Sequence, residues 1–201
     1  MILVVNSFRV SPVVRNFSRC LGLGLALWAA AAAAQSDSLW NALKHGGYVI
    51  VMRHAQTEPG TLDPPGYTLE DCGSQRKLSD AGRAQARRIG AAFRAHEVPV
   101  GRVMSSRFCR CIDTAALAFG RVEPWEMLDN VGHDEPARRQ EKRDALREIA
   151  RRWGEPGNLV LVTHGFNIQD ATGVLPAQGE MLVLRPLGEA GFRVAGRLPA
   201  D

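Results

Sequence analysis

The chain has 201 residues, of which 45% are hydrophobic, and this length and composition suit one globular domain with its own core. Its formal charge is +4, but three arginines, Arg9, Arg15 and Arg19, lie in the first 34 residues, which hold no acidic residue. Without these three, 22 of the 25 basic residues remain against 21 acidic ones, so the sequence gives no support for binding to nucleic acid.

The first 34 residues have the pattern of a secretory signal peptide. A basic stretch precedes the apolar run LGLGLALWAAAAAA, and small residues of the kind that signal peptidase prefers stand before Gln35. We therefore predict a signal peptide over residues 1–34 and a mature domain over residues 35–201. The mature protein would be periplasmic or secreted, without stable membrane insertion. The alternative is an uncleaved N-terminal anchor, for which the run is short and rich in alanine.

A strand is predicted from Gly47 to Met52, and a Pro- and Gly-rich loop without periodicity follows from Glu58 to Lys77. A loop of that length in a compact domain is usually a lid or a binding loop. Ser79 can N-cap the next segment, where apolar and small residues recur at helical spacing. These residues are Gly82, Ala86, Ile89 and Phe93.

Strands and helices continue to alternate in the second half. We predict a strand from Gly101 to Ser106, a helix that ends at Gly120, and a short edge strand within Arg121 to Leu128. A charged helix is expected from Glu135 to Trp153, followed by an apolar strand from Leu159 to Gly165 and two late strands. This order predicts an α/β fold with a mostly parallel central sheet that helices cover on both faces.

Three cysteines follow the predicted leader: Cys72, Cys109 and Cys111. In an oxidising compartment two of them can pair. Cys109 and Cys111 are two residues apart, an awkward separation on a helix, so Cys72 with either of them is favoured over free thiols. A metal site is less favoured, because no Cys-x-x-Cys is present and no His stands at ligand spacing. Nothing in the sequence calls for a metal or an organic cofactor.

Arginine and histidine side chains stand at the ends of the predicted strands. Arg53 and His54 follow the first strand, His164 follows the second fully apolar strand, and Arg110 lies about one helical turn beyond the strand between them. Because ligands of such sheets bind beyond the carboxyl ends of the strands, we expect these four side chains to converge. Two guanidinium groups suit a phosphate, and a neutral imidazole can attack phosphorus and hold the phosphoryl group covalently.

Four motifs in this order resemble the histidine phosphatase superfamily, in the branch of the phosphoglycerate mutases and phosphohistidine phosphatases: RHAQT, LSDAGRAQA, SSRFCRCIDTA and LVTHG. The resemblance implies a phosphoglycerate mutase-like three-layer αβα sandwich and a histidine phosphatase domain over residues 35–201. It also implies His54 as the nucleophile, with Arg53, Arg110 and His164 as catalytic and substrate-binding residues. The substrate would be small and phosphorylated, and exported members of the family include phosphatases of sugar phosphates.

The chain departs from the mutases of this family at the acidic proton donor. In the corresponding stretch, MLDNVGHDE, Asn130 stands where a Glu would be. Asp129, Asp134 and Glu180 are the remaining candidates for the acid. The segment EPGTLDPPG also replaces a stretch that carries an Asn in the mutases, which argues against mutase activity.

We therefore expect a hydrolase that releases phosphate from phosphomonoesters, such as sugar phosphates, or from phosphohistidine, through a phosphohistidine intermediate on His54. One alternative is a protein of the same fold that binds phosphorylated ligands without turnover. The other is a cytoplasmic phosphohistidine phosphatase.

Overall fold

The structure, a computed structural model, describes residues 35–200. The predicted signal peptide, residues 1–34, lies outside the described residues, and the fold below is that of the unit that begins at Ser38. Among residues 35–200, every helix falls short of the length and apolar character that a membrane span requires.

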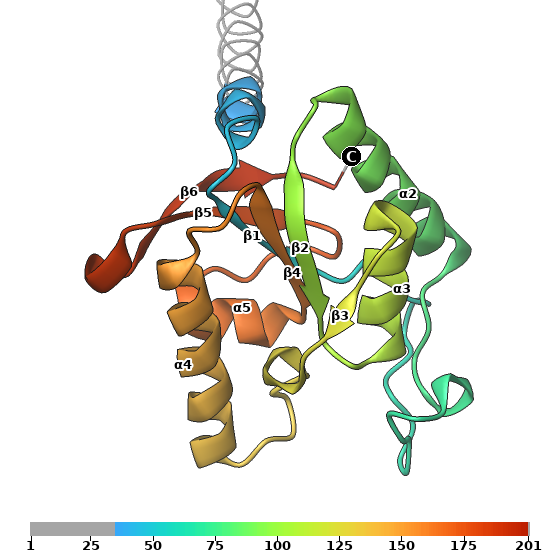
Figure 1. The fold of residues 1–201 in the computed structure, drawn as a ribbon. Coiled ribbons are helices and arrows are strands. Elements are labelled where there is room, and N and C mark those ends of the chain that lie inside the picture. The colour runs from blue at the N-terminus through green and yellow to red at the C-terminus, as the bar shows by residue number, and fades with distance from the viewer. Residues whose placement is uncertain (1–34, 201) are drawn as a thin grey trace, which may run out of the picture. The chain divides into compact units, whose positions relative to one another are not determined.

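A six-stranded sheet with the order β3-β2-β4-β1-β5-β6 forms the centre of this unit (Figure 1). Four strands, β1 to β4, are joined by parallel pairings, while β5 runs antiparallel to both β1 and β6. The predicted mostly parallel sheet is therefore confirmed, with an antiparallel addition at one side. The strands are β1 Val49–Arg53, β2 Val100–Ser105, β3 Glu123–Pro124, β4 Asn158–Thr163, β5 Met181–Pro186 and β6 Phe192–Leu198.

Helices cover both faces of the sheet, α2 and α3 on one face and α4 and α5 on the other (Figure 1). Residues 38–43 are also helical and pack with the α2 side. The α-helices are α2 Asp80–Ala95, α3 Cys109–Phe119, α4 Pro136–Arg152 and α5 Gly165–Thr172. The 3-10 turns are η1 Cys72–Ser74, η2 Glu126–Leu128 and η3 Gly188–Ala190.

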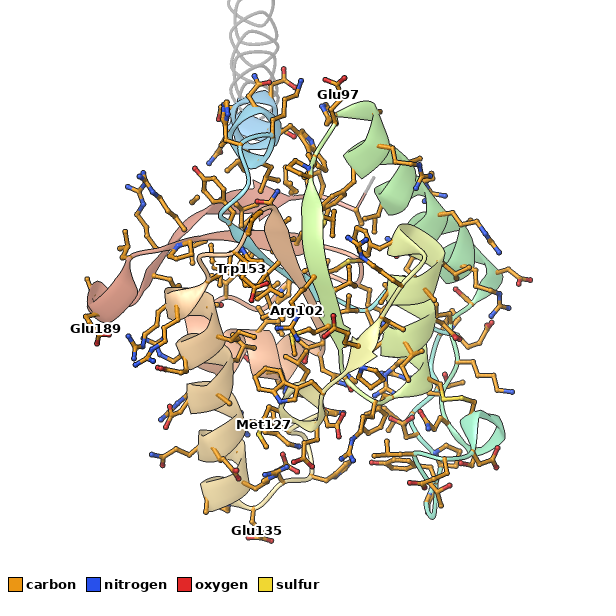
Figure 2. All side chains as sticks on the ribbon, viewed as in Figure 1. Glu97, Arg102, Met127, Glu135, Trp153 and Glu189 are labelled. Atoms are coloured by element: carbon orange, nitrogen blue, oxygen red, sulfur yellow. A yellow bond between two sulfur atoms is a disulfide. The ribbon has the colours of Figure 1, made fainter. Side chains whose placement is uncertain are left out.

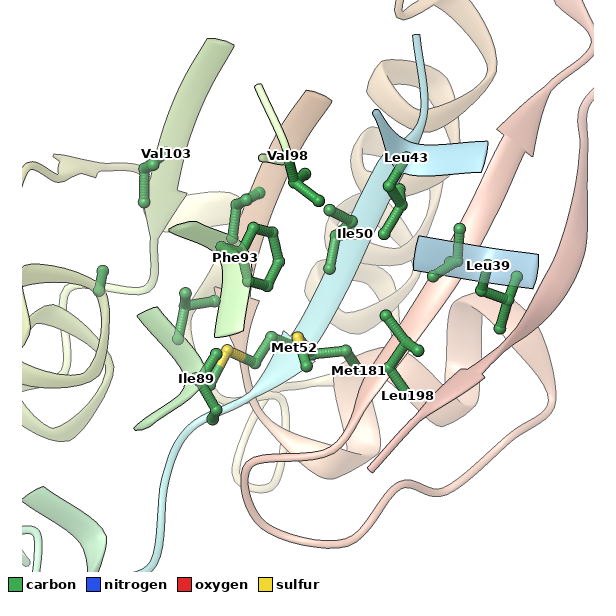
Figure 3. Close-up of a cluster of buried hydrophobic side chains, with 14 of the residues drawn as sticks. Leu39, Leu43, Ile50, Met52, Ile89, Phe93, Val98, Val103, Met181 and Leu198 are labelled. Atoms are coloured by element: carbon green, nitrogen blue, oxygen red, sulfur yellow. The ribbon is translucent and has the colours of Figure 1, made fainter. Parts of the chain in front are cut away.

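The two faces of the sheet have separate hydrophobic cores, because consecutive strand residues point to opposite sides. Ile50 and Met52 of β1 pack in one cluster with Ile89 and Phe93 of α2 (Figure 3). Val49 and Val51 of the same strand belong to the other cluster, which includes side chains of α4 and α5. These two cores confirm the three-layer αβα sandwich.

The cap predicted at Ser79 is present, since its Oγ accepts a hydrogen bond from Gly82 N at 3.0 Å. All four residues expected on the inner face of α2 are buried. The helix predicted to end at Gly120 is α3, and Gly120 adopts φ +70°, the left-handed conformation that commonly ends helices.

The short edge strand predicted within Arg121 to Leu128 is present as Glu123–Pro124 at the end of the sheet, and the chain then turns into η2. Helix α5 was not predicted, since it has only eight residues and follows its strand directly, so that no separate periodic pattern marks it.

Candidate active site

The parallel strands β1 and β4 deliver the two histidines to one edge of the sheet. Arg53 pairs with Thr163 at the strand ends, and His54 N donates to Thr163 O at 3.0 Å. The residues that follow are therefore neighbours: the ring centroids of His54 and His164 are 5.5 Å apart. Both side chains are buried, with 2% and 3% of their surface exposed. The convergence predicted from the strand ends is present for both histidines.

The two histidines open onto a pocket of about 150 Å³. It combines charged groups with two large apolar side chains at its mouth. Its lining residues are Arg53, His54, Arg76, Asn130, His164, Gly165, Phe166 and Leu175.

Arg110 lies beside this pocket in the first turn of α3, fully buried. Its Nη2 is 3.4 Å from His164 Nδ1, and its Nη1 donates to Asp63 Oδ1 at 2.8 Å. The guanidinium carbon stands 4.5 Å from the ring centroid of Phe108. The second predicted arginine thus contacts the second predicted histidine directly.

Three arginine Nε–H groups in this region are buried and meet no acceptor within residues 35–200. They belong to Arg53, Arg76 and Arg110. Buried donors are nearly always satisfied in folded proteins, so a cluster of three unsatisfied donors around two histidines fits an anionic ligand. Burial, and then the positive charge of Arg110, lower the pKa of both Arg53 and Arg76 below the usual arginine value. A phosphate between these groups would relieve their mutual repulsion.

Sequence reasoning missed Arg76, which comes from the long loop and not from a strand end. Its backbone N–H donates to Asp63 Oδ1 at 3.0 Å, and its Nη1 donates to Thr61 O at 3.2 Å. The same Asp63 oxygen accepts from Arg110, so one carboxylate links the loop arginine to the helix arginine. The only signal in the sequence was the length of the loop, which indicated a binding role without naming a residue.

The loop is fastened to the start of α3 by a disulfide between Cys72 and Cys109, whose Cα atoms are 5.7 Å apart. Gln75 Oε1 accepts a hydrogen bond from Cys109 N at 2.9 Å, while its amide nitrogen binds carbonyl oxygens of the loop itself. Of the two pairings that the sequence left open, Cys72 with Cys109 is therefore present, and Cys111 is free and buried. The crosslink attaches directly beside Arg110.

The protonation of His54 suits a nucleophile. Its Nδ1 lies 2.8 Å from Ala55 O, so Nδ1–H donates to that carbonyl and the lone pair is on Nε2. Burial lowers the pKa of His54 to about 3, and the charges of Arg110, Arg53 and Arg76 add to this lowering. The imidazole is therefore neutral at neutral pH.

Hydrogen bonds to both ring nitrogens hold His164. Arg110 Nη2 donates toward Nδ1, so Nε2 carries the proton and donates to Ser106 Oγ at 2.9 Å. Ser106 in turn donates to Asp129 Oδ1 at 3.1 Å. Burial, followed by the charge of Arg110, keeps the pKa of His164 well below its usual value. His164 is thus a neutral, fixed group, linked by Ser106 to Asp129.

The three candidate proton donors are engaged outside the pocket. Asp129 is only 4% exposed and accepts from Ser106 and from Arg107 N and Nε, the last two at 2.7 and 2.8 Å. Asp134 pairs with Lys142 at 2.6 Å. Glu180 forms a two-pronged ion pair with Arg197 and accepts from Ala177 N. Asn130, which stands where the mutases carry their acid, does line the pocket.

A larger cavity of about 580 Å³ lies elsewhere, between α4 and the β2–β3 side of the sheet. Trp153 and Arg102, labelled in Figure 2, are among its lining residues, and it shares none with the histidine pocket. Across residues 35–200, no group of three or more His, Cys, Asp or Glu side chains is arranged to hold a metal ion.

Several solved structures have a similar fold. One is the product of an open reading frame of Mycobacterium tuberculosis, with 17% identity over 77% of this chain and 98% of that chain, at a TM-score of 0.59. Another is a mycobacterial glucosyl-3-phosphoglycerate phosphatase, with 17% identity over 74% and 97% of the two chains and a TM-score of 0.53. A third is the protein histidine phosphatase SixA complexed with tungstate, with 17% identity over 76% and 97% and a TM-score of 0.50. At these identities the likeness establishes the fold.

No curated protein matches the chain. The model of the histidine phosphatase superfamily (branch 1) matches residues 49–160, which is more than half of the chain and runs from β1 into β4. The chain belongs to the histidine phosphatase superfamily, branch 1.

Proposed function

We propose that the protein is a phosphatase that hydrolyses phosphomonoesters through a phosphohistidine intermediate on His54. The observation that carries this proposal is the pairing of a neutral, buried imidazole with three arginine Nε–H donors that have no acceptor among residues 35–200. A neutral imidazole has a lone pair to give to phosphorus, and guanidinium groups remain charged and match phosphate oxygens in geometry.

In the first step Nε2 of His54 forms a bond to phosphorus while the bond from phosphorus to the ester oxygen breaks. The leaving oxygen takes the bonding electron pair. Negative charge on the three equatorial oxygens is stabilised by Arg53, Arg76 and Arg110. The bond from Nδ1–H of His54 to Ala55 O holds the ring in the tautomer that this attack needs.

In the second step the oxygen of a water molecule attacks the phosphohistidine. The N–P bond breaks and its electron pair returns to Nε2, while the water oxygen, with both of its protons, becomes part of the released dihydrogen phosphate, which then equilibrates with bulk water. The ring centroid of His164 is 5.5 Å from that of His54, and hydrogen bonds to Arg110 and Ser106 fix the ring there. Because both of its ring nitrogens are already bonded, we assign His164 a positioning role: it holds the guanidinium group of Arg110 beside His54.

The names of similar structures support the phosphatase class. They include a protein histidine phosphatase and a glucosyl-3-phosphoglycerate phosphatase, names that cover a phosphoryl group on a histidine and one on the oxygen of a phosphoglycerate. Both kinds of compound belong in a first substrate panel for this protein.

We also propose that the protein is exported and acts in the periplasm or outside the cell. The leader pattern in residues 1–34 and the Cys72–Cys109 disulfide both support this location, because disulfides persist in oxidising compartments. N-terminal sequencing of protein from a fractionated native cell should find Gln35 as the first residue in the exported fraction. Full-length protein in the cytoplasm would contradict export.

The test of activity is phosphate release from a panel of phosphomonoesters and phosphohistidine, with His54→Ala beside the unchanged protein. We expect the substitution to abolish release, while His45→Ala, which removes an exposed histidine, leaves it intact. If no compound in the panel is hydrolysed while vanadate or phosphate still binds, the protein is a binder of phosphorylated ligands and the proposal is wrong.

A further inference from the structure

Two of the four exposed large hydrophobic side chains in residues 35–200 line the phosphate pocket. Phe166 is 51% exposed and Leu175 is 48% exposed, while Leu62 and Leu187 do not line the pocket. Exposed apolar side chains that gather at one pocket mark a place where an apolar part of a ligand binds. We call Phe166 and Leu175 the apolar rim.

The two residues of the apolar rim come from opposite ends of α5. Phe166 is in the first turn, two residues after His164, and Leu175 follows the end of the helix at Gly173. A Cβ added at Gly165 would lie 2.9 Å from Leu175 Cδ1 and 3.4 Å from Arg53 Nε. The leucine methyl group and the guanidinium group of Arg53 therefore face the same small space, so a ligand can contact the rim and the arginines together.

Four carboxyl groups that are candidates to protonate a leaving oxygen are committed to other contacts. Asp129, Asp134 and Glu180 are held by arginine or lysine partners, and Asp63 accepts from both Arg110 and the backbone of Arg76. Asn130, which lines the pocket, carries an amide in place of an acid. The leaving oxygen must then depart as an anion, which a phenolate does far more readily than an alkoxide because phenols ionise near pH 10.

We propose that the substrates of this protein are aryl phosphates, in which the phosphoryl group is on the oxygen of an aromatic ring. This inference rests on the proposed phosphatase function and narrows its substrate class. The three arginines take the phosphoryl group, and the apolar rim takes the flat face of the aromatic ring, which stacks or packs edge-on against Phe166. The two rim side chains offer no hydrogen-bond partner to the hydroxyl groups of a sugar, so they favour an aromatic ring over a polyhydroxylated one.

The bond changes with an aryl phosphate are those of the two steps proposed above. Nε2 of His54 bonds to phosphorus, the bond between phosphorus and the aryl oxygen breaks, and the phenolate leaves with the electron pair. The phenolate takes its proton from bulk water after departure. Hydrolysis of the phosphohistidine then regenerates the neutral imidazole.

The experiment compares kcat/KM for phenyl phosphate, 4-nitrophenyl phosphate, cyclohexyl phosphate and glycerol phosphate, using the full-length chain as expressed. We expect 4-nitrophenyl phosphate to react faster than phenyl phosphate, since its phenol is the more acidic, and both to react faster than the two alkyl esters. Phenyl phosphate and cyclohexyl phosphate have similar size, so their difference reports the leaving oxygen and the flatness of the ring.

Variants of the apolar rim separate this inference from general phosphatase activity. Phe166→Ala and Leu175→Ala should each raise KM for phenyl phosphate about 2- to 10-fold, the size of one aromatic or apolar contact, and leave inhibition by inorganic phosphate unchanged. Leu187→Ala, which removes an exposed leucine that does not line the pocket, should change neither.

Each outcome has one meaning. Equal rates for cyclohexyl and phenyl phosphate, with KM insensitive to both rim substitutions, would overturn the aryl assignment while the phosphatase function stands. A rim variant that weakens inhibition by phosphate as much as it raises KM would show a structural effect and likewise overturn the assignment. Absence of phosphate release from all four esters, together with no phosphate on His54, would overturn the proposed function itself.

Discussion

His54 and His164 lie close together, but their hydrogen bonds leave one ring nitrogen of His54 free and none of His164. In His54 the Nδ1–H group is held by the carbonyl of the next residue, which leaves the Nε2 lone pair for chemistry. In His164 both ring nitrogens are engaged, by Arg110 and by Ser106. The backbone geometry at the end of β1 thus leaves Nε2 of the proposed nucleophile free, and the side chains around β2 and α3 fix its neighbour.

Arg76 should strengthen phosphate binding through both its charge and its Nε–H group. Arg76→Ala should raise the inhibition constant for inorganic phosphate about 10- to 100-fold, which is the loss of one to two charge-assisted hydrogen bonds. Arg76→Lys should recover only part of this loss, because an ammonium group has no planar fork. Phosphate inhibition measured beside Arg87→Ala, an exposed arginine on α2, checks the prediction. Equal inhibition in Arg76→Ala and the unchanged protein would contradict it.

Residues at the ends of strands could be predicted from the sequence, while residues delivered by loops could not. Arg53, His54 and His164 directly follow apolar strands, so strand pattern and the geometry of parallel sheets suffice to bring them together. Arg76 depends on how the disulfide and Asp63 fold the long loop back onto α3. The apolar rim depends likewise on α5, which the sequence pattern did not reveal.

The long loop between β1 and α2 is held in place by the Cys72–Cys109 disulfide. It carries no α-helix or named strand of its own, and the Cys72–Cys109 disulfide joins residues 37 positions apart. Closing a chain segment of this length stabilises the folded state by about 3 to 4 kcal/mol in the loop-entropy account. The loop also carries Arg76, so loosening the loop should weaken the proposed phosphate site.

Cys72→Ala should therefore lower the melting temperature by about 10 °C and raise KM for substrate. Reductant should produce similar changes in the unchanged protein and none in the variant, since Cys111 is not crosslinked. Differential scanning calorimetry and steady-state kinetics with and without reductant measure both effects. Identical melting and activity of the two proteins under all conditions would show that the crosslink supports neither the fold nor the site.

Helix α2 approaches the segment after His54 so closely that only glycine fits at Gly82. A Cβ at this position would lie 1.8 Å from Gln56 O, a backbone atom that cannot move alone. Gly82→Ala should cost about 1 to 3 kcal/mol of stability and also lower kcat, because Gln56 is two residues from His54, the proposed nucleophile. Ala81→Ser, on the exposed neighbour in the same helical turn, should change stability by less than about 0.5 kcal/mol. Urea unfolding of both variants tests this, and equal midpoints would refute the close approach.

The two buried histidines make the stability of the whole protein depend on pH. Their pKa values are lowered in the folded protein, to about 3 for His54, from an ordinary value of 6.5. Between these values the unfolded chain binds protons that the folded protein excludes. Stability should therefore fall as pH drops below 6.5, by about 2 kcal/mol at pH 5 from His54 alone.

Thermal unfolding at pH 7 and pH 5 measures this dependence. We expect a lower melting temperature at pH 5, and a smaller decrease in His54→Asn, where one of the two titrating groups is gone. His45→Ala serves as a control, because its side chain is exposed in the folded protein. The same decrease in His54→Asn as in the unchanged protein would mean that the buried imidazole does not drive the pH dependence.

Transfer of the phosphoryl group to His54 can be detected by rapid quenching during turnover of 4-nitrophenyl phosphate. Samples quenched in alkali, where phosphohistidine survives, would be digested and the peptide around Arg53-His54-Ala55 examined by mass spectrometry for one added phosphoryl group. We predict a phosphorylated peptide that disappears as substrate is exhausted and that is absent in His54→Ala. Steady phosphate release without any modification of this peptide would contradict the account, because water would then attack the substrate directly.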